Sequence, residues 1–224
     1  MSRILVGDDL HKSFGPTQAL RGASIVLDEG EIVAMMGPSG SGKSTLVHCL
    51  AGMLTPDCGE VHFAGRRIDQ LPDRERTHLR RTVFGFVFQF GQLVPELPAV
   101  ENIALPLLLA GRRRKQALAA AAPWLSRLGL DGLGERLPGE LSGGQGQRVA
   151  MARALVANPR VVFADEPTGS LDSVAADQVM ELVDAAREQG TSVLMVTHEP
   201  RVAAYADRTV LVRDGVDALE VGAA

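Results

Sequence analysis

Apolar and polar positions follow two different patterns along this chain of 224 residues. Short apolar runs rich in β-branched residues predict strands, and longer segments with apolar positions at helical spacing predict helices. The strands are expected over residues 4–6, 24–27, 32–36, 83–88, 161–164, 192–196 and 210–212, and the helices over residues 43–53, 116–128, 142–156 and 173–189. Strands that alternate with helices in this way predict an α/β fold with a largely parallel sheet.

The strand signals vanish between Pro95 and Gly139, where an Ala- and Leu-rich helical composition takes over. We interpret this region as a helical insertion between two strands of the sheet. The length suits one compact domain or a core with one subdomain. We therefore expect a single domain over residues 1–224, with a core of residues 1–90 and 157–224 and a helical subdomain of residues 91–156.

Composition narrows the class of protein. The chain is 46% hydrophobic and 22% charged with a net charge of −4, which indicates a globular fold and argues against a nucleic-acid partner. Two cysteines in so long a chain, Cys49 and Cys58, do not form a disulfide scaffold, and we expect free buried thiols. Residues 1–10 do not resemble a signal peptide, and the most apolar window, residues 103–110, is too short for a membrane helix. We expect a cytoplasmic protein that reaches a membrane only through a partner.

A phosphate-binding loop follows the strand predicted at residues 32–36. The run Gly37-Pro38-Ser39-Gly40-Ser41-Gly42-Lys43-Ser44 fits the pattern G-x-x-x-x-G-K-[ST] and leads into a helix. The glycines let backbone N–H groups turn toward a polyphosphate, and the helix start adds a positive dipole end. Lys43 would reach the β- and γ-phosphates and Ser44 would bind Mg²⁺. Phosphate binding alone leaves kinases, GTPases and motors open.

Two acidic residues, Asp165 and Glu166, follow the strand predicted at residues 161–164. Asp165 follows this apolar run directly, as in the Walker B strand of nucleotide-hydrolysing proteins. At the carboxyl end of the strand, Asp165 would lie across from Ser44 and hold Mg²⁺. Glu166 comes next, where its carboxylate could polarise an attacking water.

The run Leu141-Ser142-Gly143-Gly144-Gln145 matches the LSGGQ signature of ABC cassettes. The order of motifs also matches: phosphate loop, Gln89 after a strand, signature, Asp165, a Ser170-Leu171-Asp172 turn, then His198. The chain therefore resembles the ATP-binding subunits of ABC transporters. The resemblance implies a P-loop NTPase with a RecA-like core, an N-terminal antiparallel β region and a helical insertion. It also implies ATP and Mg²⁺ as ligands and ATP hydrolysis as the activity.

The signature implies a partner as well. Ser142 can cap the helix that it opens, and Gly143 and Gly144 leave the helix N-terminus open to an anion. In ABC proteins this end meets the γ-phosphate of ATP bound to the opposite subunit, so the resemblance implies a head-to-tail dimer. The chain departs from the pattern at Gly146, where a larger residue is common, and at Glu199, where many relatives have Asp.

The remaining site residues are implied one by one. Gln89 corresponds to a glutamine that contacts Mg²⁺ or water and senses the membrane subunit, and His198 to a histidine that contacts the γ-phosphate. Asp172 corresponds to an acidic residue of the loop between subunits, and Phe14 to an aromatic residue that stacks on adenine. The expected catalytic residues are Lys43, Gln89, Glu166 and His198, and the expected Mg²⁺ ligands are Ser44, Gln89 and Asp165. The expected nucleotide contacts are Phe14, residues 37–44, Thr45, Ser142, Gly143, Gly144, Gln145 and Asp172.

Residues 86–93 and 100–107 are similar to those of cassettes from macrolide exporters and lipoprotein-release systems. Such cassettes act with an integral-membrane permease of the FtsX-like type, which implies a location on the inner face of the cell membrane. A cell-division cassette and an importer cassette are the alternatives. The permease would dock around residues 89–109, where Phe86, Phe90 and Leu93 line a groove or belong to the core. The four basic residues at positions 112–115 either contact anionic lipid headgroups or form a solvated helix start.

Overall fold

The computed structural model describes residues 2–88, 92–169 and 171–221. The strands are β1 (Arg3–Phe14), β2 (Thr17–Asp28), β3 (Ile32–Met36), β4 (Cys58–Phe63), β5 (Arg66–Arg67), β6 (Phe84–Val87), β7 (Val161–Asp165), β8 (Ser192–Val196), β9 (Arg208–Arg213) and β10 (Val216–Val221). The helices are α1 (Lys43–Leu50), α2 (Asp73–Thr82), α3 (Ala99–Leu109), α4 (Arg114–Arg127), α5 (Gly143–Leu155), α6 (Ser173–Glu188) and α7 (Pro200–Ala203), with a 3₁₀ turn at Pro138–Glu140.

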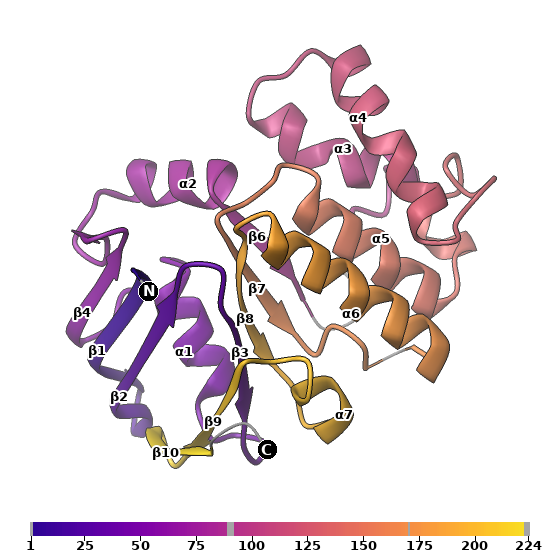
Figure 1. The fold of residues 1–224 in the computed structure, drawn as a ribbon. Helices are drawn as coiled ribbons and strands as arrows, with labels where there is room; N and C mark the ends of the chain where they lie inside the picture. Colours follow the sequence, from indigo (N-terminus) through magenta and orange to yellow (C-terminus); the bar gives the residue numbers. More distant parts are fainter. Residues whose placement is uncertain (1, 89–91, 170, 222–224) are drawn as a thin grey trace.

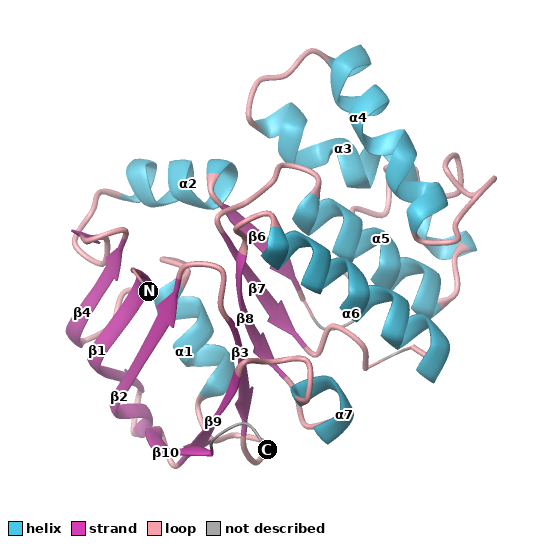
Figure 2. Ribbon diagram, in the orientation of Figure 1, coloured by secondary structure: helices cyan, strands magenta, loops and turns pink. Residues whose placement is uncertain are grey.

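Two sheets organise these elements (Figures 1 and 2). The larger sheet has the strand order β10-β9-β3-β8-β7-β6, and all of its pairs are parallel except β10 with β9. The smaller sheet, in the order β2-β1-β4-β5, is antiparallel. The structure thus has the predicted mainly parallel sheet and the antiparallel N-terminal region.

The larger sheet separates two buried apolar clusters because neighbouring residues of a strand point to opposite faces. In β7, Phe163 packs into the cluster that contains α1 and the smaller sheet. Val162 and Ala164 pack into the other cluster, with α3, α5 and α6. Both faces of β7 are therefore buried, which explains why its sequence is a continuous apolar run rather than an alternating one.

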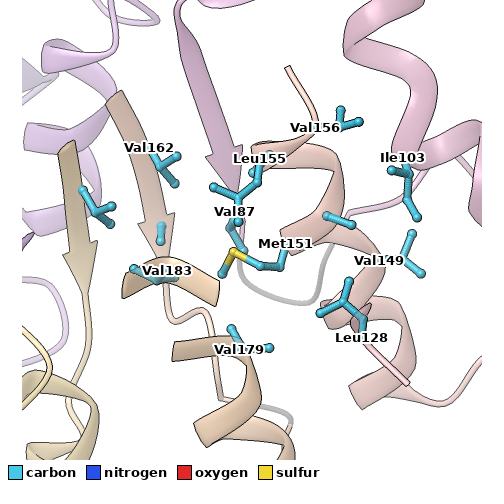
Figure 3. Close-up of a cluster of buried hydrophobic side chains, with 14 of the residues drawn as sticks. Val87, Ile103, Leu128, Val149, Met151, Leu155, Val156, Val162, Val179 and Val183 are labelled. Carbon is cyan, nitrogen blue, oxygen red and sulfur yellow. The ribbon is translucent and has the colours of Figure 1, made fainter. Parts of the chain in front are cut away.

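Helices from the insertion complete the second cluster. Figure 3 shows Val87 of β6 near Met151 of α5, with Ile103 of α3 beyond Val149. Figure 1 places α5 and α6 against the larger sheet and α3 and α4 farther out, whereas α1 lies between the two sheets. The elements α3, α4 and α5 all lie between β6 and β7 in the chain, as the change in composition predicts.

Some elements differ from the prediction. β1 and β2 each have 12 residues, far more than the segments 4–6 and 24–27. The helix α2 has no buried residue, so its sequence lacks the apolar spacing by which a helix is recognised. Cys49 is buried as expected, but Cys58 is exposed, because β4 becomes buried only from Val61 onward. Within the described ranges, no helix has the length and apolar character needed to cross a membrane.

Candidate functional site

The phosphate loop joins β3 to α1, at the carboxyl end of a parallel strand. Gly42 precedes the first residue of α1 and has a φ of 100°. A Cβ on Gly37 would lie 2.1 Å from the Val212 carbonyl oxygen, and one on Gly42 would lie 2.4 Å from the Ala19 carbonyl oxygen. Only glycine fits these two positions, because a side chain there would collide with backbone from two other strands.

Lys43 folds back over this loop. Its Nζ donates hydrogen bonds to the carbonyl oxygens of Gly37 at 2.9 Å and Pro38 at 2.8 Å. Burial lowers the pKa of Lys43, and the carboxylates of Glu166 and Asp165 oppose that shift. The loop therefore offers a cation, together with a helix N-terminus, to a polyphosphate.

Ser44 and Asp165 meet across the site although 121 positions separate them in the chain. The Ser44 hydroxyl donates to Asp165 Oδ2 at 3.2 Å. Ser44 belongs to α1 and Asp165 ends β7, so the parallel sheet brings together two motifs that the sequence keeps apart. A hydroxyl and a carboxylate are oxygen donors of the kind that Mg²⁺ prefers.

Glu166 and His198 form the second contact of the site. The Glu166 Oε1 atom lies 2.7 Å from His198 Nδ1, and the hydrogen bond to Glu166 raises the pKa of His198. The Glu166 side chain is 14% exposed, whereas that of His198 is 72% exposed. Glu166 Oε2 is buried and has no hydrogen-bond partner among the described residues, so this carboxylate keeps one acceptor uncommitted.

The signature segment forms the N-terminus of α5. Ser142 Oγ accepts from the Gln145 N–H at 3.2 Å, and Gln145 Oε1 accepts from the Ser142 N–H at 2.8 Å. This reciprocal capping box fixes the first turn of the helix. The helix continues through Gly146, whose N–H donates to the Ser142 carbonyl oxygen at 2.9 Å. Glycine at that position therefore does not interrupt the helix.

The other predicted residues lie in separate places. Asp172 caps α6 by accepting from the Ala175 N–H at 2.8 Å. Phe14 ends β1 with half of its surface exposed, so it is not a core residue, and Lys12 Nζ lies 5.9 Å from its ring centre. The expected residues Gln89, Phe90 and Ser170 lie outside the described part of the chain.

An apolar groove lies beside β6, at the region predicted to dock a permease. We define the groove by Phe86, Phe88, Leu105, Pro106 and Leu109, with Arg80, Arg81, Gln92 and Arg153 also lining it. Phe86 stacks on the Phe88 ring at 5.8 Å and on the buried Phe163 ring at 5.6 Å. Phe86 therefore belongs to the core and to the groove at once. Leu93 packs against the helical cluster instead.

One polar residue of the site was not predicted from the sequence. Gln147 is 1% exposed, and its Nε2 donates to the Pro167 carbonyl oxygen at 3.1 Å, next to Glu166. The available signal was its position, because Gln147 lies on the same helix face as the buried Ala150, Met151 and Ala154. A polar residue in a buried apolar stripe needs a hydrogen-bond partner, and here that partner is the Pro167 carbonyl oxygen in the turn that follows Glu166.

Comparison with known proteins decides the family. The family model described as ABC transporter matches residues 20–169. The chain belongs to the ABC transporter family. This ABC cassette is 43% identical over 220 residues to the lipoprotein-releasing system ATP-binding protein LolD of Geobacter metallireducens, covering 96% of the cassette and 98% of LolD.

Two further relatives bear on the cassette's fold and activity. It is 43% identical over 215 residues to the macrolide export ATP-binding/permease protein MacB of Chlorobium luteolum, covering 93% of the cassette but only 32% of MacB. A dimeric structure of the cassette MJ0796, in a post-hydrolysis state with ADP and Pi, matches with a TM-score of 0.93 at 36% identity over 99% of both chains. The predicted ABC cassette fold is confirmed, and the chain is the ATP-binding ATPase subunit of an ABC transporter.

Proposed function

We propose that this cassette drives a separate FtsX-like permease in the membrane by ATP-dependent closure of a head-to-tail dimer. In this role the chain would lie on the inner face of the cell membrane, held there by the permease, and would serve export, lipoprotein release or signalling. The similarity to LolD, a protein of a lipoprotein-releasing system, supports this choice. We also propose that residues 91–156 act as one helical subdomain on a core of residues 1–90 and 157–224.

The loop and the two acidic residues supply the hydrolytic chemistry in this proposal. Lys43 binds the β- and γ-phosphates, and Ser44 and Asp165 hold Mg²⁺, for which their oxygen atoms are suitable ligands. When bound, Mg²⁺ neutralises phosphate charge. Glu166 orients the attacking water, and His198 holds the carboxylate through its contact with Oε1. We assign to Gln89 the role predicted for it, which is contact with Mg²⁺ or water and sensing of the membrane subunit.

A second copy completes each site in this proposal. The phosphate-loop helix α1 and the signature helix α5 pack against opposite faces of the larger sheet within one chain. Ser142 and Gly143 are exposed at the N-terminus of α5, where the helix dipole favours an anion. We therefore assign these residues to the γ-phosphate of the ATP that is bound to the partner. Asp172 would lie in the loop between the two subunits, and Phe14 would stack on the adenine of ATP.

The groove is the observation that carries the permease proposal. Leu109 is 53% exposed and lines the groove together with Phe88, Leu105 and Pro106, and a grouped apolar surface of this kind is typical of a protein-binding site. The exposed Arg81 lies at the same groove. The best occupant is a permease helix with an apolar face and acidic residues beside it. Its movement would reach the site through Phe86, which stacks on Phe163 two residues before Asp165.

Reconstitution with an FtsX-type permease from the same organism tests this function. In proteoliposomes the permease should stimulate ATP hydrolysis by the wild-type chain and by the matched variant Leu109→Met. Leu109→Asp should keep its basal rate and lose the stimulation, because a carboxylate in the groove repels an acidic partner. Equal stimulation of Leu109→Asp, or binding of an importer permease in place of the FtsX-type one, would reject the proposal.

A further inference from the structure

Gln147 joins two parts of the site that sequence motifs treat as independent. It lies in α5, five residues after the cap Ser142, so that only about 7.5 Å of helix separates it from the signature end. Its Nε2 donates to the Pro167 carbonyl oxygen at 3.1 Å and more weakly to the Glu166 carbonyl oxygen at 3.5 Å. The signature helix is thus bonded directly to the turn that carries Glu166.

The turn at Glu166 needs outside support. Glu166 has a φ of 49°, which places a non-glycine residue in the left-handed region. Its N–H donates to the Val196 carbonyl oxygen of β8 at 2.9 Å, and Gly169 N–H donates to the Glu166 carbonyl oxygen at 3.3 Å. The Gln147 amide adds support from the helical side. The direction of the Glu166 carboxylate therefore depends on contacts from both a strand and α5.

Packing alone does not explain a glutamine at this position. Gln147 Oε1 is buried and has no hydrogen-bond partner among the described residues. An unpaired buried acceptor is unfavourable, so a methionine of similar length would pack there without that cost. What glutamine adds is the N–H donor that reaches the Glu166 turn. The side chain thus serves the turn rather than the stability of α5.

We propose that Gln147 is a positioning residue for ATP hydrolysis: its amide ties the signature helix to the Glu166 turn and so fixes the direction of the Glu166 carboxylate. This inference rests on the proposed role of Glu166 in orienting water. In a head-to-tail dimer, the signature and Glu166 of one chain serve different ATP molecules. Gln147 would therefore link the engagement of one site to hydrolysis at the other.

The test separates turnover from ATP binding. Gln147→Met removes the donor at nearly constant size and should lower kcat about 10- to 100-fold, while the Kd for ATP stays near that of the wild type. Gln147→Asn keeps the amide but withdraws it by one methylene group, so its kcat should be intermediate. The matched control Val149→Ala, buried in the same helix, should lower Tm but keep kcat at a temperature where it remains folded.

A double variant tests whether Gln147 acts through Glu166. Gln147→Met combined with Glu166→Gln should hydrolyse ATP no more slowly than Glu166→Gln alone, because both changes remove the same contribution. A wild-type kcat for folded Gln147→Met, or losses that multiply in the double variant, would overturn the inference while leaving the function of Glu166 intact. A wild-type rate for Glu166→Gln alone would instead reject the role of Glu166, and this inference with it.

Discussion

Two glycines of the phosphate loop should respond very differently to alanine. Gly40 and Gly42 have φ values of 78° and 100°, so alanine is strained at both positions. A Cβ on Gly42 would lie 2.4 Å from the Ala19 carbonyl oxygen, whereas a Cβ on Gly40 would have no atom within 4 Å. The pair of variants therefore separates backbone strain, which both share, from a steric collision that only Gly42→Ala introduces.

The size of the difference follows from these distances. Left-handed strain costs an L-residue about 1–2 kcal/mol, and this term applies to both variants. The atom struck by the new methyl group of Gly42→Ala belongs to the backbone, so no side-chain rotation relieves the collision. Overpacking of this kind adds about 1–3 kcal/mol. Because each kcal/mol lowers Tm by about 2–4 °C in a domain of this size, Gly42→Ala should melt roughly 2–12 °C below Gly40→Ala.

Thermal unfolding followed by far-ultraviolet circular dichroism measures this difference. Wild type, Gly40→Ala and Gly42→Ala are compared without nucleotide at one protein concentration, so that ligand binding does not shift Tm. Equal Tm values for the two variants, or a lower Tm for Gly40→Ala, would show that the collision with Ala19 does not exist and that the loop is placed differently.

Three further predictions concern the site. Lys43→Ala should lower ATP turnover about 100-fold or more in a steady-state assay, because it removes the cation of the loop; a wild-type rate would reject the phosphate-loop assignment. Phe14→Ala should raise the Kd for ATP by about 5- to 100-fold in a fluorescent-nucleotide titration, with Tm unchanged because Phe14 is half exposed. Histidine NMR should show a His198 pKa above 6.5 that falls toward 6.5 in Glu166→Gln. Since the raised pKa favours the protonated form, this contact stabilises the fold fully below about pH 6.5 and is lost as pH rises through the folded pKa; a His198 pKa that Glu166→Gln leaves unchanged would contradict it.

The sequence predicts best the strands that are buried along nearly their whole length. β3 and β8 are buried runs, and their observed bounds equal the predicted ones. β1 extends to Phe14, beyond the apolar segment, because its pairing with β2 continues through polar residues such as His11 and Lys12. That pairing is a long-range property, which a local pattern of apolar positions does not contain.

The residues of the candidate site also fall into two groups, those that the sequence identifies and those that only the fold brings together. Lys43 and Ser142 stand in motifs whose chemistry depends on neighbours in the chain, so the sequence alone identifies them. The contact of Ser44 with Asp165 and that of Glu166 with His198 need the parallel sheet to bring distant strand ends together. Gln147 belongs to none of the predicted motifs; its place on the buried face of α5 was the available signal, and its role follows only from its contact with the Glu166 turn.

The mass of Glu166→Gln in solution, with and without ATP and Mg²⁺, tests the central claim most directly. If two chains close head to tail on ATP, slow hydrolysis should hold them together, and light scattering after gel filtration should give twice the 23.8 kDa of one chain. Adding Ser142→Arg should abolish this dimer, because it blocks the exposed N-terminus of α5. A Glu166→Gln protein that binds ATP and still elutes at the mass of one chain would contradict the account.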